Sequence, residues 1–193
     1  MPEMQAEIDL MFTDLAIGDP GRVQQSFPKL WDAAINGAAW RPWLGGGRLA
    51  LVRAELALQT EGAEDAAIHA TRALEMARKV GRPKYEAASR AILGEALVRF
   101  GDTNRGLSEL RQAAADADRL GSPAESWRIR AMLGKQLYAT GDDAASAAAY
   151  ERASASIVRY AKSLRPDHAA VFLAAAPVSE VLKTSHKTDV PFA

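Results

Sequence analysis

Three glycines recur along the chain at nearly equal intervals, and this repeat constrains the fold more than any other feature. Gly62 and Gly101 are 39 residues apart (101 − 62), and Gly101 and Gly141 are 40 apart (141 − 101). Each lies between two runs of helix-forming residues. A period of this length is typical of helical-hairpin arrays, in which each unit buries its apolar face against its neighbours. The sequence therefore predicts an all-α superhelical array of about four antiparallel hairpins.

The apolar pattern supports helices throughout the middle of the chain. Apolar residues recur at three- and four-residue steps from Arg48 to Leu164, and alternating β-branched runs are missing. We expect helices at residues 3–17, 21–37, 41–61, 63–80, 83–100, 103–120, 123–140 and 143–164. The expected parts are a divergent N-terminal hairpin (1–39), three repeated hairpins (40–166), a C-terminal capping segment (167–182) and a flexible tail (183–193).

Polar residues mark several of the expected helix starts. Ser122 and Glu125 have the spacing of a capping box, and Pro123 would occupy the first helical position, where its missing N–H costs nothing. Asp102 and Asp142 each follow a repeated glycine and can cap the helix that begins there.

Aligning the units on the three glycines exposes matched positions. A small residue follows each glycine by five positions, where two helices can approach closely. A Leu-Gly pair precedes the second and third glycines, and a proline follows Gly81 and Gly121 by two positions. The structural repeat positions are Gly62, Gly101, Gly141, Leu93, Gly94, Leu133, Gly134, Ala67, Gly106, Ser146, Pro83 and Pro123.

These matched positions resemble the tetratricopeptide repeat. The family pattern has Leu-Gly early in the first helix, a large residue three positions later, a small residue and then an alanine in the second helix, and a proline at the exit. The units here are about 40 residues long, whereas the standard unit has about 34. HEAT and armadillo units have the longer length, but their usual prolines and bends are not evident. The matching residues are Leu93, Gly94, Leu97, Gly106, Ala113 and Pro123, and then Leu133, Gly134, Leu137, Ser146, Ala153 and Pro166.

The long, alanine-rich units are also similar to the C-terminal arrays of bacterial ATPase-containing signalling proteins, such as LuxR-type transcription regulators and cyclase-linked ATPases. The segment from Asp167 to Leu182 is similar to the way such arrays end. The resemblance implies a regulatory module, either the tail of a larger protein or a small protein built from the same array. Nothing matches the phosphate-binding loop of their ATPase domains, because Arg48 and Leu49 follow the Gly45–Gly47 run.

Composition excludes several classes of function. Lys plus Arg (24) balances Asp plus Glu (24), so we expect no direct nucleic-acid or membrane partner. Cysteine is absent, which removes disulfides, thiolate zinc sites and thiol nucleophiles. The first ten residues lack a basic start and an apolar run, and no apolar stretch approaches 20 residues. We expect a cytoplasmic protein.

No residue pattern predicts catalysis or a cofactor. The three histidines, His69, His168 and His186, have no second ligand at metal spacing. Serines 89, 108, 126 and 154 fall within expected helices, where a nucleophile elbow is not formed. The Gly45–Gly47 run predicts a flexible joint. We expect no enzyme, no cofactor and no metal, while an enzyme with a site on the concave face remains an alternative.

The charged residues on the first helix of each hairpin are the candidate binding residues, because that helix lines the inner face of such arrays. Arg90 and Arg130 occupy the same register position, as do Glu95 and Lys135. They form either an ordinary solvated face, with ion pairs worth less than about 1 kcal/mol each, or a groove that grips an acidic or extended peptide. The concave-face candidates are Arg53, Arg90, Glu95, Trp127, Arg130 and Lys135.

The expected partner is another protein or peptide, with upstream domains or a second copy of the chain as further options. Tryptophans are frequent anchors at such interfaces, although core and capping roles are more common. Part of the Trp127 ring is expected to stay accessible, and Trp40 and Trp43 could either cover the open end of the array or form a partner contact. The sequence thus predicts a non-catalytic interaction or regulatory scaffold. A sensor of a small molecule or peptide is the alternative.

Overall fold

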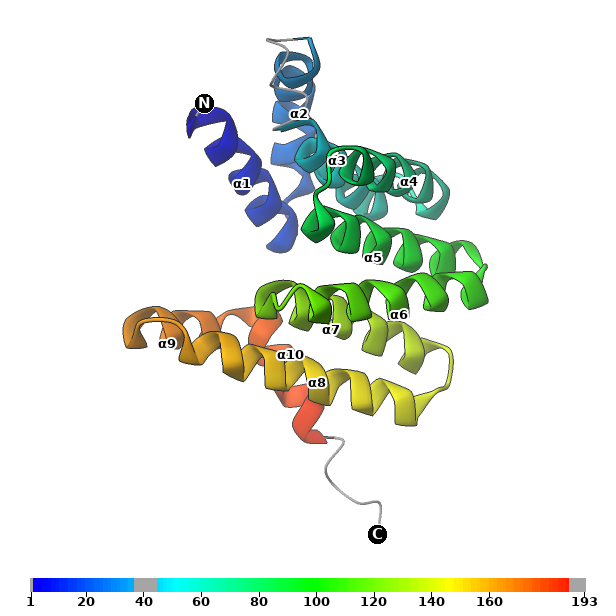
Figure 1. Ribbon diagram of the computed structural model, residues 1–193, viewed down its shortest axis with the longest axis vertical. Coiled ribbons are helices and arrows are strands. Elements are labelled where there is room, and N and C mark those ends of the chain that lie inside the picture. The colour runs from blue at the N-terminus through cyan, green and yellow to red at the C-terminus, as the bar shows by residue number, and fades with distance from the viewer. Residues whose placement is uncertain (1, 37–44, 188–193) are drawn as a thin grey trace. The chain divides into compact units, whose positions relative to one another are not determined.

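The structure, a computed structural model, describes residues 2–36 and 45–187 and is entirely helical over these ranges (Figure 1). The described residues form helices and no strand, so the all-α prediction is confirmed. The helices are α1 (Pro2–Ala16), α2 (Pro20–Ile35), α3 (Gly47–Thr60), α4 (Ala63–Lys79), α5 (Pro83–Phe100), α6 (Thr103–Arg119), α7 (Pro123–Ala139), α8 (Asp143–Lys162), α9 (Pro166–Ala174) and α10 (Ala176–Lys187).

Most helix bounds lie within two residues of the sequence prediction, and the largest differences lie near residue 45 and at the C-terminus. Gly45 and Gly46 form a buried helical turn that leads into α3, so the prediction of a flexible joint there is wrong. A Cβ on Gly45 would lie 3.0 Å from Met4 Cε, and one on Gly46 would lie 3.1 Å from Met76 Cε. The glycines therefore allow close packing. Trp40 and Trp43 lie outside the described residues.

The chain divides into two compact units, Met1–Glu109 (unit 1) and Leu110–Ala193 (unit 2), and the division falls within α6. In unit 1, α1, α2 and α3 pack on one another, and α4 packs on both α3 and α5. In unit 2, α7 packs along α8, and α8 also contacts α9 and α10. Each unit has its own core: Ile8, Val23 and Val52 are fully buried in unit 1, and Ile157 is fully buried in unit 2.

Two of the three repeated glycines, Gly101 and Gly141, close the first helix of their hairpins in the same way. In the first unit the predicted match is wrong, because the C-cap residue of α3 is Glu61 and Gly62 is the residue that precedes α4. Gly101 and Gly141 have φ angles of 107° and 82°, a conformation that a side chain would disfavour. The next residue then donates a backbone hydrogen bond back into the helix, from Asp102 to the Leu97 carbonyl (2.9 Å) and from Asp142 to the Leu137 carbonyl (3.0 Å). The matched leucines and glycines of the sequence thus build one recurring turn.

The small residues at the fifth position after Gly101 and Gly141 lie where the two helices of a hairpin approach closely. A Cβ added to Gly106 would lie 2.6 Å from the Gly94 carbonyl oxygen. One unit later, the Ser146 hydroxyl donates a hydrogen bond to the Gly134 carbonyl (2.8 Å). The equivalent carbonyls of the first helices, those of Gly94 and Gly134, therefore face a glycine without a side chain in one hairpin and a serine hydroxyl in the next.

The capping predictions have mixed outcomes. The carboxylates of Asp102 and Asp142 accept hydrogen bonds from the backbone N–H of Arg105 (3.4 Å) and Ala145 (3.1 Å), as predicted. The predicted capping box at Ser122 is wrong, because the Ser122 side chain makes no capping hydrogen bond and lines a cavity instead.

The C-terminal segment is more ordered than the sequence predicts. Helix α10 continues to Lys187, so the first five residues of the predicted tail are helical. Val178 and Val181 are buried against Trp127 and Ile157, and this contact holds α10 on the rest of unit 2. Ser185 is also buried. Residues 188–193 lie outside the described part of the chain.

Candidate functional site

A polar cavity of about 390 Å³ lies within unit 2, where the end of α6, the start of α7 and the second half of α8 come together. Its charged residues are three arginines and one aspartate. The lining residues are Ala117, Asp118, Gly121, Ser122, Pro123, Ser126, Arg130, Arg152, Ala155, Ser156 and Arg159.

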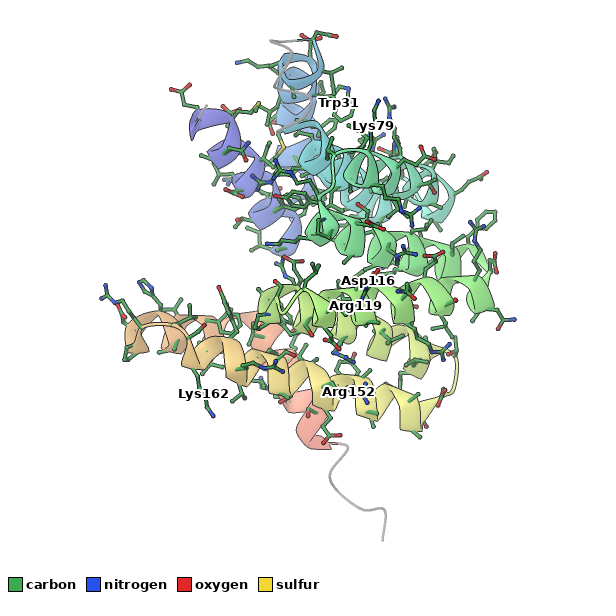
Figure 2. The ribbon with its side chains drawn as sticks, viewed as in Figure 1. Trp31, Lys79, Asp116, Arg119, Arg152 and Lys162 are labelled. Carbon is green, nitrogen blue, oxygen red and sulfur yellow. The ribbon has the colours of Figure 1, made fainter. Side chains whose placement is uncertain are left out.

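Helical periodicity explains why α8 presents its polar residues to the cavity together. Arg152, Ser156 and Arg159 are spaced i, i+4 and i+7, so they share one face of α8. Figure 2 labels Arg152 on this helix. Ser126 and Arg130, also four residues apart, share the facing stripe of α7. The cavity is therefore lined by two polar stripes on neighbouring helices.

Asp118 fixes the α7 side of the cavity. Its carboxylate accepts a hydrogen bond from the Ser126 hydroxyl (2.7 Å) and bonds from two nitrogens of Arg130, one of them Nε at 3.4 Å. Partial burial pushes the pKa of Asp118 upward, but the bonds from Arg130 and Ser126 and the charges of Arg130 and Arg152 outweigh it. The net effect lowers the pKa below its ordinary value. Asp118 is therefore anionic at neutral pH.

The floor of the cavity is a buried pair of serines. The hydroxyl oxygens of Ser126 and Ser156 lie 3.3 Å apart, and the Ser156 hydroxyl donates to the backbone carbonyl of Arg152 (3.0 Å). Both serines are at most 5% exposed. Ser126 donates its one hydroxyl proton to Asp118, so the two serine oxygens are in contact without a hydrogen bond between them.

The walls of the cavity carry excess positive charge. Arg130, Arg152 and Arg159 face one carboxylate, Asp118, which leaves a net charge of +2. Arg130 is 8% exposed and paired with Asp118. Arg152 and Arg159 are exposed and form no ion pair with any residue in the described ranges. The positive end of the α7 dipole adds to this field, since the helix begins at Pro123. The site is built to attract an anion.

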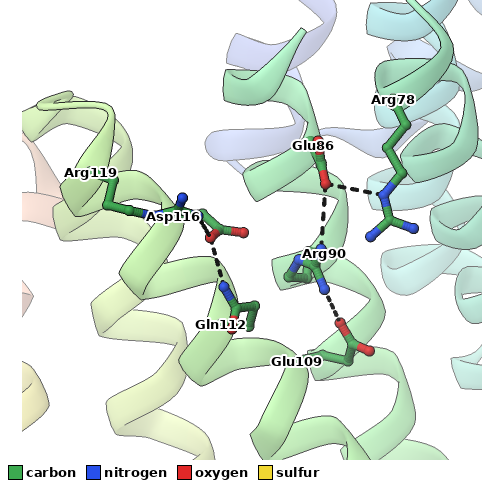
Figure 3. A network of polar contacts seen from close by, with 7 residues as sticks. All are labelled: Arg78, Glu86, Arg90, Glu109, Gln112, Asp116 and Arg119. Carbon is green, nitrogen blue, oxygen red and sulfur yellow. Dashed lines mark hydrogen bonds and ion pairs between the residues drawn. The ribbon is translucent and has the colours of Figure 1, made fainter. Parts of the chain in front are cut away.

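The equivalent positions one repeat earlier, in unit 1, are occupied differently (Figure 3). Arg78, Glu86 and Arg90 lie 40 residues before Asp118, Ser126 and Arg130. Glu86 accepts bonds from Arg78 Nε (3.0 Å) and Arg90 (3.4 Å), and Glu109 accepts another from Arg90 (2.9 Å). Arg90 is therefore held by two carboxylates within unit 1, whereas the cavity of unit 2 has three arginines and one carboxylate.

Other predicted binding residues are also engaged within the protein. Arg53 donates two hydrogen bonds to Glu61, at 2.6 and 2.8 Å. These bonds lower the pKa of Glu61 more than the partial burial of its carboxyl group raises it. Glu95 is 6% exposed and pairs with Arg99, so it is not an open contact residue. Lys135 is exposed on α7 and does not line the cavity. Of the six candidates, the structure brings only Arg130 to the cavity.

Trp127 is a core residue, and the expectation that its ring stays accessible is wrong. It is 7% exposed and packs with Ala153, Ile157 and Val178. Its ring meets Phe172 edge-on, with centroids 6.4 Å apart. The sequence could not reveal this burial, because α9 and α10 supply the covering side chains.

A smaller cavity of about 170 Å³ lies in unit 1, between α2, α3 and α4. Phe27 and Trp31 stack on its α2 side with ring centroids 5.6 Å apart, and the Arg72 guanidinium lies 5.6 Å from the Trp31 ring centre. Arg53 and His69 complete the polar wall. Burial lowers the pKa of His69, and the positive charge of Arg53 acts in the same direction.

Sequence reasoning missed the residues that complete the unit 2 cavity: Asp118, Arg152 and Arg159. The i, i+4, i+7 spacing of Arg152, Ser156 and Arg159 was a usable signal, because it places three polar groups on one helix face. The Asp118–Arg130 pair is separated by 12 residues and a helix turn, so it required the hairpin geometry.

Within residues 2–36 and 45–187, no three His, Asp or Glu side chains come together in a way that could hold a metal ion. None of the helices in these ranges combines the length and the apolar character that a membrane span requires. Comparison of the chain with family models, curated proteins and solved structures found no match.

Proposed function

We propose that this protein is a non-catalytic interaction module, built from tetratricopeptide-like hairpins, that binds an acidic segment of a partner protein in the unit 2 cavity. The observation that carries the proposal is the cavity of about 390 Å³ lined by three arginines and one aspartate. The matched turns at Gly101 and Gly141 and the Leu-Gly pairs support the repeat family.

Arginine suits this role because its planar guanidinium offers forked donors that match a carboxylate. Arg152 and Arg159 are seven residues apart on α8, which corresponds to about 10 Å along the helix axis. Three residues of an extended peptide span about the same distance. A partner segment with acidic side chains three residues apart could therefore contact both arginines at once.

The α7 side of the cavity is also fixed before a ligand binds. Arg130 is already held by Asp118, and the serine pair is buried between α7 and α8. A binding site fixed in advance loses little conformational entropy when the ligand arrives. The resemblance to the arrays of bacterial signalling ATPases suggests a cytoplasmic regulatory setting, with a separate protein, upstream domains or a second copy supplying the acidic segment.

The test is direct binding of a fluorescein-labelled hexaglutamate peptide, measured by fluorescence anisotropy at about 50 mM salt. Charge reversals at the two exposed arginines, Arg152→Glu and Arg159→Glu, should each weaken binding at least tenfold, because they replace an attraction by a repulsion. Lys183→Glu changes the charge equally at an exposed position on α10 that does not line the cavity, and it should weaken binding less than twofold.

Two results would contradict the proposal. One is no measurable binding of hexaglutamate by the wild-type chain. The other is equal weakening by Arg152→Glu and Lys183→Glu, which would assign the attraction to net charge and not to the cavity. Circular dichroism spectra and melting curves of each variant must match those of the wild type, which separates lost binding from lost folding.

A further inference from the structure

We propose that the preferred ligand group of the unit 2 cavity is a phosphomonoester dianion carried on a side chain of the partner segment. The inference rests on the proposed function and refines it. It states that the cavity distinguishes a phosphorylated side chain from a carboxylate, which makes the interaction one that phosphorylation of the partner switches on.

Charge balance is the first argument. The lining arginines, Arg130, Arg152 and Arg159, exceed the one carboxylate, Asp118, by two positive charges. A single Glu or Asp side chain would neutralise half of this excess. A phosphate on Ser, Thr or Tyr carries a charge of about −1.5 to −2 at pH 7 and would neutralise nearly all of it.

The spatial distribution of donors is the second argument. Arg152 and Arg159 line the cavity from α8, and Ser122 lines it just before the start of α7, where its side chain makes no capping hydrogen bond. Helix N-termini favour phosphate because the dipole and the first-turn amides point toward it. Three phosphate oxygens directed to different walls can use these donors together. The two coplanar oxygens of a carboxylate reach fewer of them.

Arg130 and Asp118 have a positioning role in this proposal. Asp118 holds Arg130 through the fork of the guanidinium, and it holds Ser126 by a hydrogen bond of 2.7 Å. This arrangement keeps the positive charge of Arg130 at the cavity wall. Arg130 is shielded from solvent there, since it is only 8% exposed. The two arginines of α8 are exposed and able to close on the ligand.

The experiment compares three peptides of one sequence, eight residues of alternating glycine and alanine with a central phosphoserine, glutamate or serine. Binding to the full chain is followed by ¹H–¹⁵N NMR titration, which detects millimolar affinities. The phosphoserine peptide is expected to bind at least tenfold more tightly than the glutamate peptide, and the serine peptide should cause no shifts. Inorganic phosphate should bind at least tenfold more weakly than the phosphoserine peptide, because the rest of the peptide adds contacts at the cavity.

The pH dependence provides an independent readout. The second phosphate ionisation has a pKa of about 6, so affinity for the phosphoserine peptide should rise several-fold between pH 5 and pH 7.5. Affinity for the glutamate peptide should change less than twofold. The charged groups that face the ligand are Asp118 from α6, Arg130 from α7, and Arg152 and Arg159 from α8. None of them changes its charge in this range, because the pKa of Asp118 is lowered and arginine stays protonated.

The outcomes separate this inference from the proposed function. Equal affinities for the phosphoserine and glutamate peptides would overturn the phosphate preference and leave the acidic-segment function standing. Inorganic phosphate that binds as tightly as the phosphopeptide would overturn the assignment to a protein side chain. Absence of any binding by both charged peptides would overturn both. Arg152→Lys keeps the positive charge but loses the forked donors of the guanidinium. It should lower the affinity for the phosphoserine peptide several-fold and leave the fold unchanged.

Discussion

Replacement of Gly106 by alanine tests how the repeated hairpins are packed. Gly106 lies early in α6 and faces α5. A Cβ there would come within 2.6 Å of both the Gly94 carbonyl oxygen and Val98 Cγ2, and within 2.7 Å of the Val98 backbone nitrogen. Two of these three atoms belong to the backbone, so rotation of a side chain cannot relieve the overlap.

The magnitude follows from this geometry. Ordinary contact of a Cβ begins at 3.4 Å, so the 2.6 Å approach falls about 0.8 Å short and the two helices must separate by a similar distance. Overpacking of this kind costs about 1–3 kcal/mol, and the higher helix propensity of alanine returns about 1 kcal/mol. We expect Gly106→Ala to lower the free energy of unfolding by up to about 2 kcal/mol, and Gly106→Leu to lower it by more.

Urea denaturation followed by circular dichroism at 222 nm measures this difference. Gly47→Ala is the matched control, because Gly47 is also buried in a helix but, among the residues that the structure describes, has no atom within 4 Å of an added Cβ. Its unfolding free energy should stay unchanged or rise by up to about 1 kcal/mol. If Gly106→Ala were as stable as Gly47→Ala, the close approach of α5 and α6 at the small position would be refuted.

Three further perturbations test the cores and the polar floor. Trp127→Ala should lower the free energy of unfolding by about 3–5 kcal/mol, as measured by urea denaturation, because Trp127 is 7% exposed in the unit 2 core; a loss below about 1 kcal/mol would place the ring at the surface. Ser89→Ala should raise the melting temperature, because the Ser89 hydroxyl is fully buried on α5 and has no hydrogen-bond partner in the described part of the chain; a lower melting temperature would indicate an unseen partner. Asp118 has a lowered pKa in the folded state, so its contribution to stability is complete above the ordinary carboxyl pKa and is lost as the pH falls through the folded value. Asp118→Asn should therefore destabilise at pH 7 and should flatten the fall in the urea midpoint between pH 5 and pH 3, and an unchanged pH profile would argue against the Arg130 pair.

The fold was largely predictable because its determinants are local in sequence. Apolar spacing and the glycine turns located α4 to α7 within about one residue of their observed ends. The turn at Gly101 depends on residues 97 to 102, all of which are visible in one short window. By contrast, the helical state of residues 183–187 depends on burial of Val178 and Val181 against Trp127. Those contacts join segments about 50 residues apart, so no local pattern reports them.

The candidate site was predictable only in part. Arg130 was identified because it recurs 40 residues after Arg90, but the repeat does not reveal how the surrounding positions differ. Asp118 replaces Arg78 and Ser126 replaces Glu86 at the equivalent positions, and these exchanges change the local balance of charge. Which arginines are neutralised, and by which carboxylates, depends on helix packing that a linear pattern leaves undetermined.

We expect an acidic segment to bind in the arginine-lined cavity of unit 2, and NMR shift mapping measures this location most directly. A ¹⁵N-labelled full chain would be titrated with unlabelled hexaglutamate, and the shifts of assigned backbone amides would be recorded. The largest shifts should fall on Gly121, Ser122 and Ser126 and on residues 152–159 of α8, which line the cavity. Shifts spread evenly over exposed lysines and arginines, or concentrated around the unit 1 cavity at Trp31 and Arg72, would contradict the account.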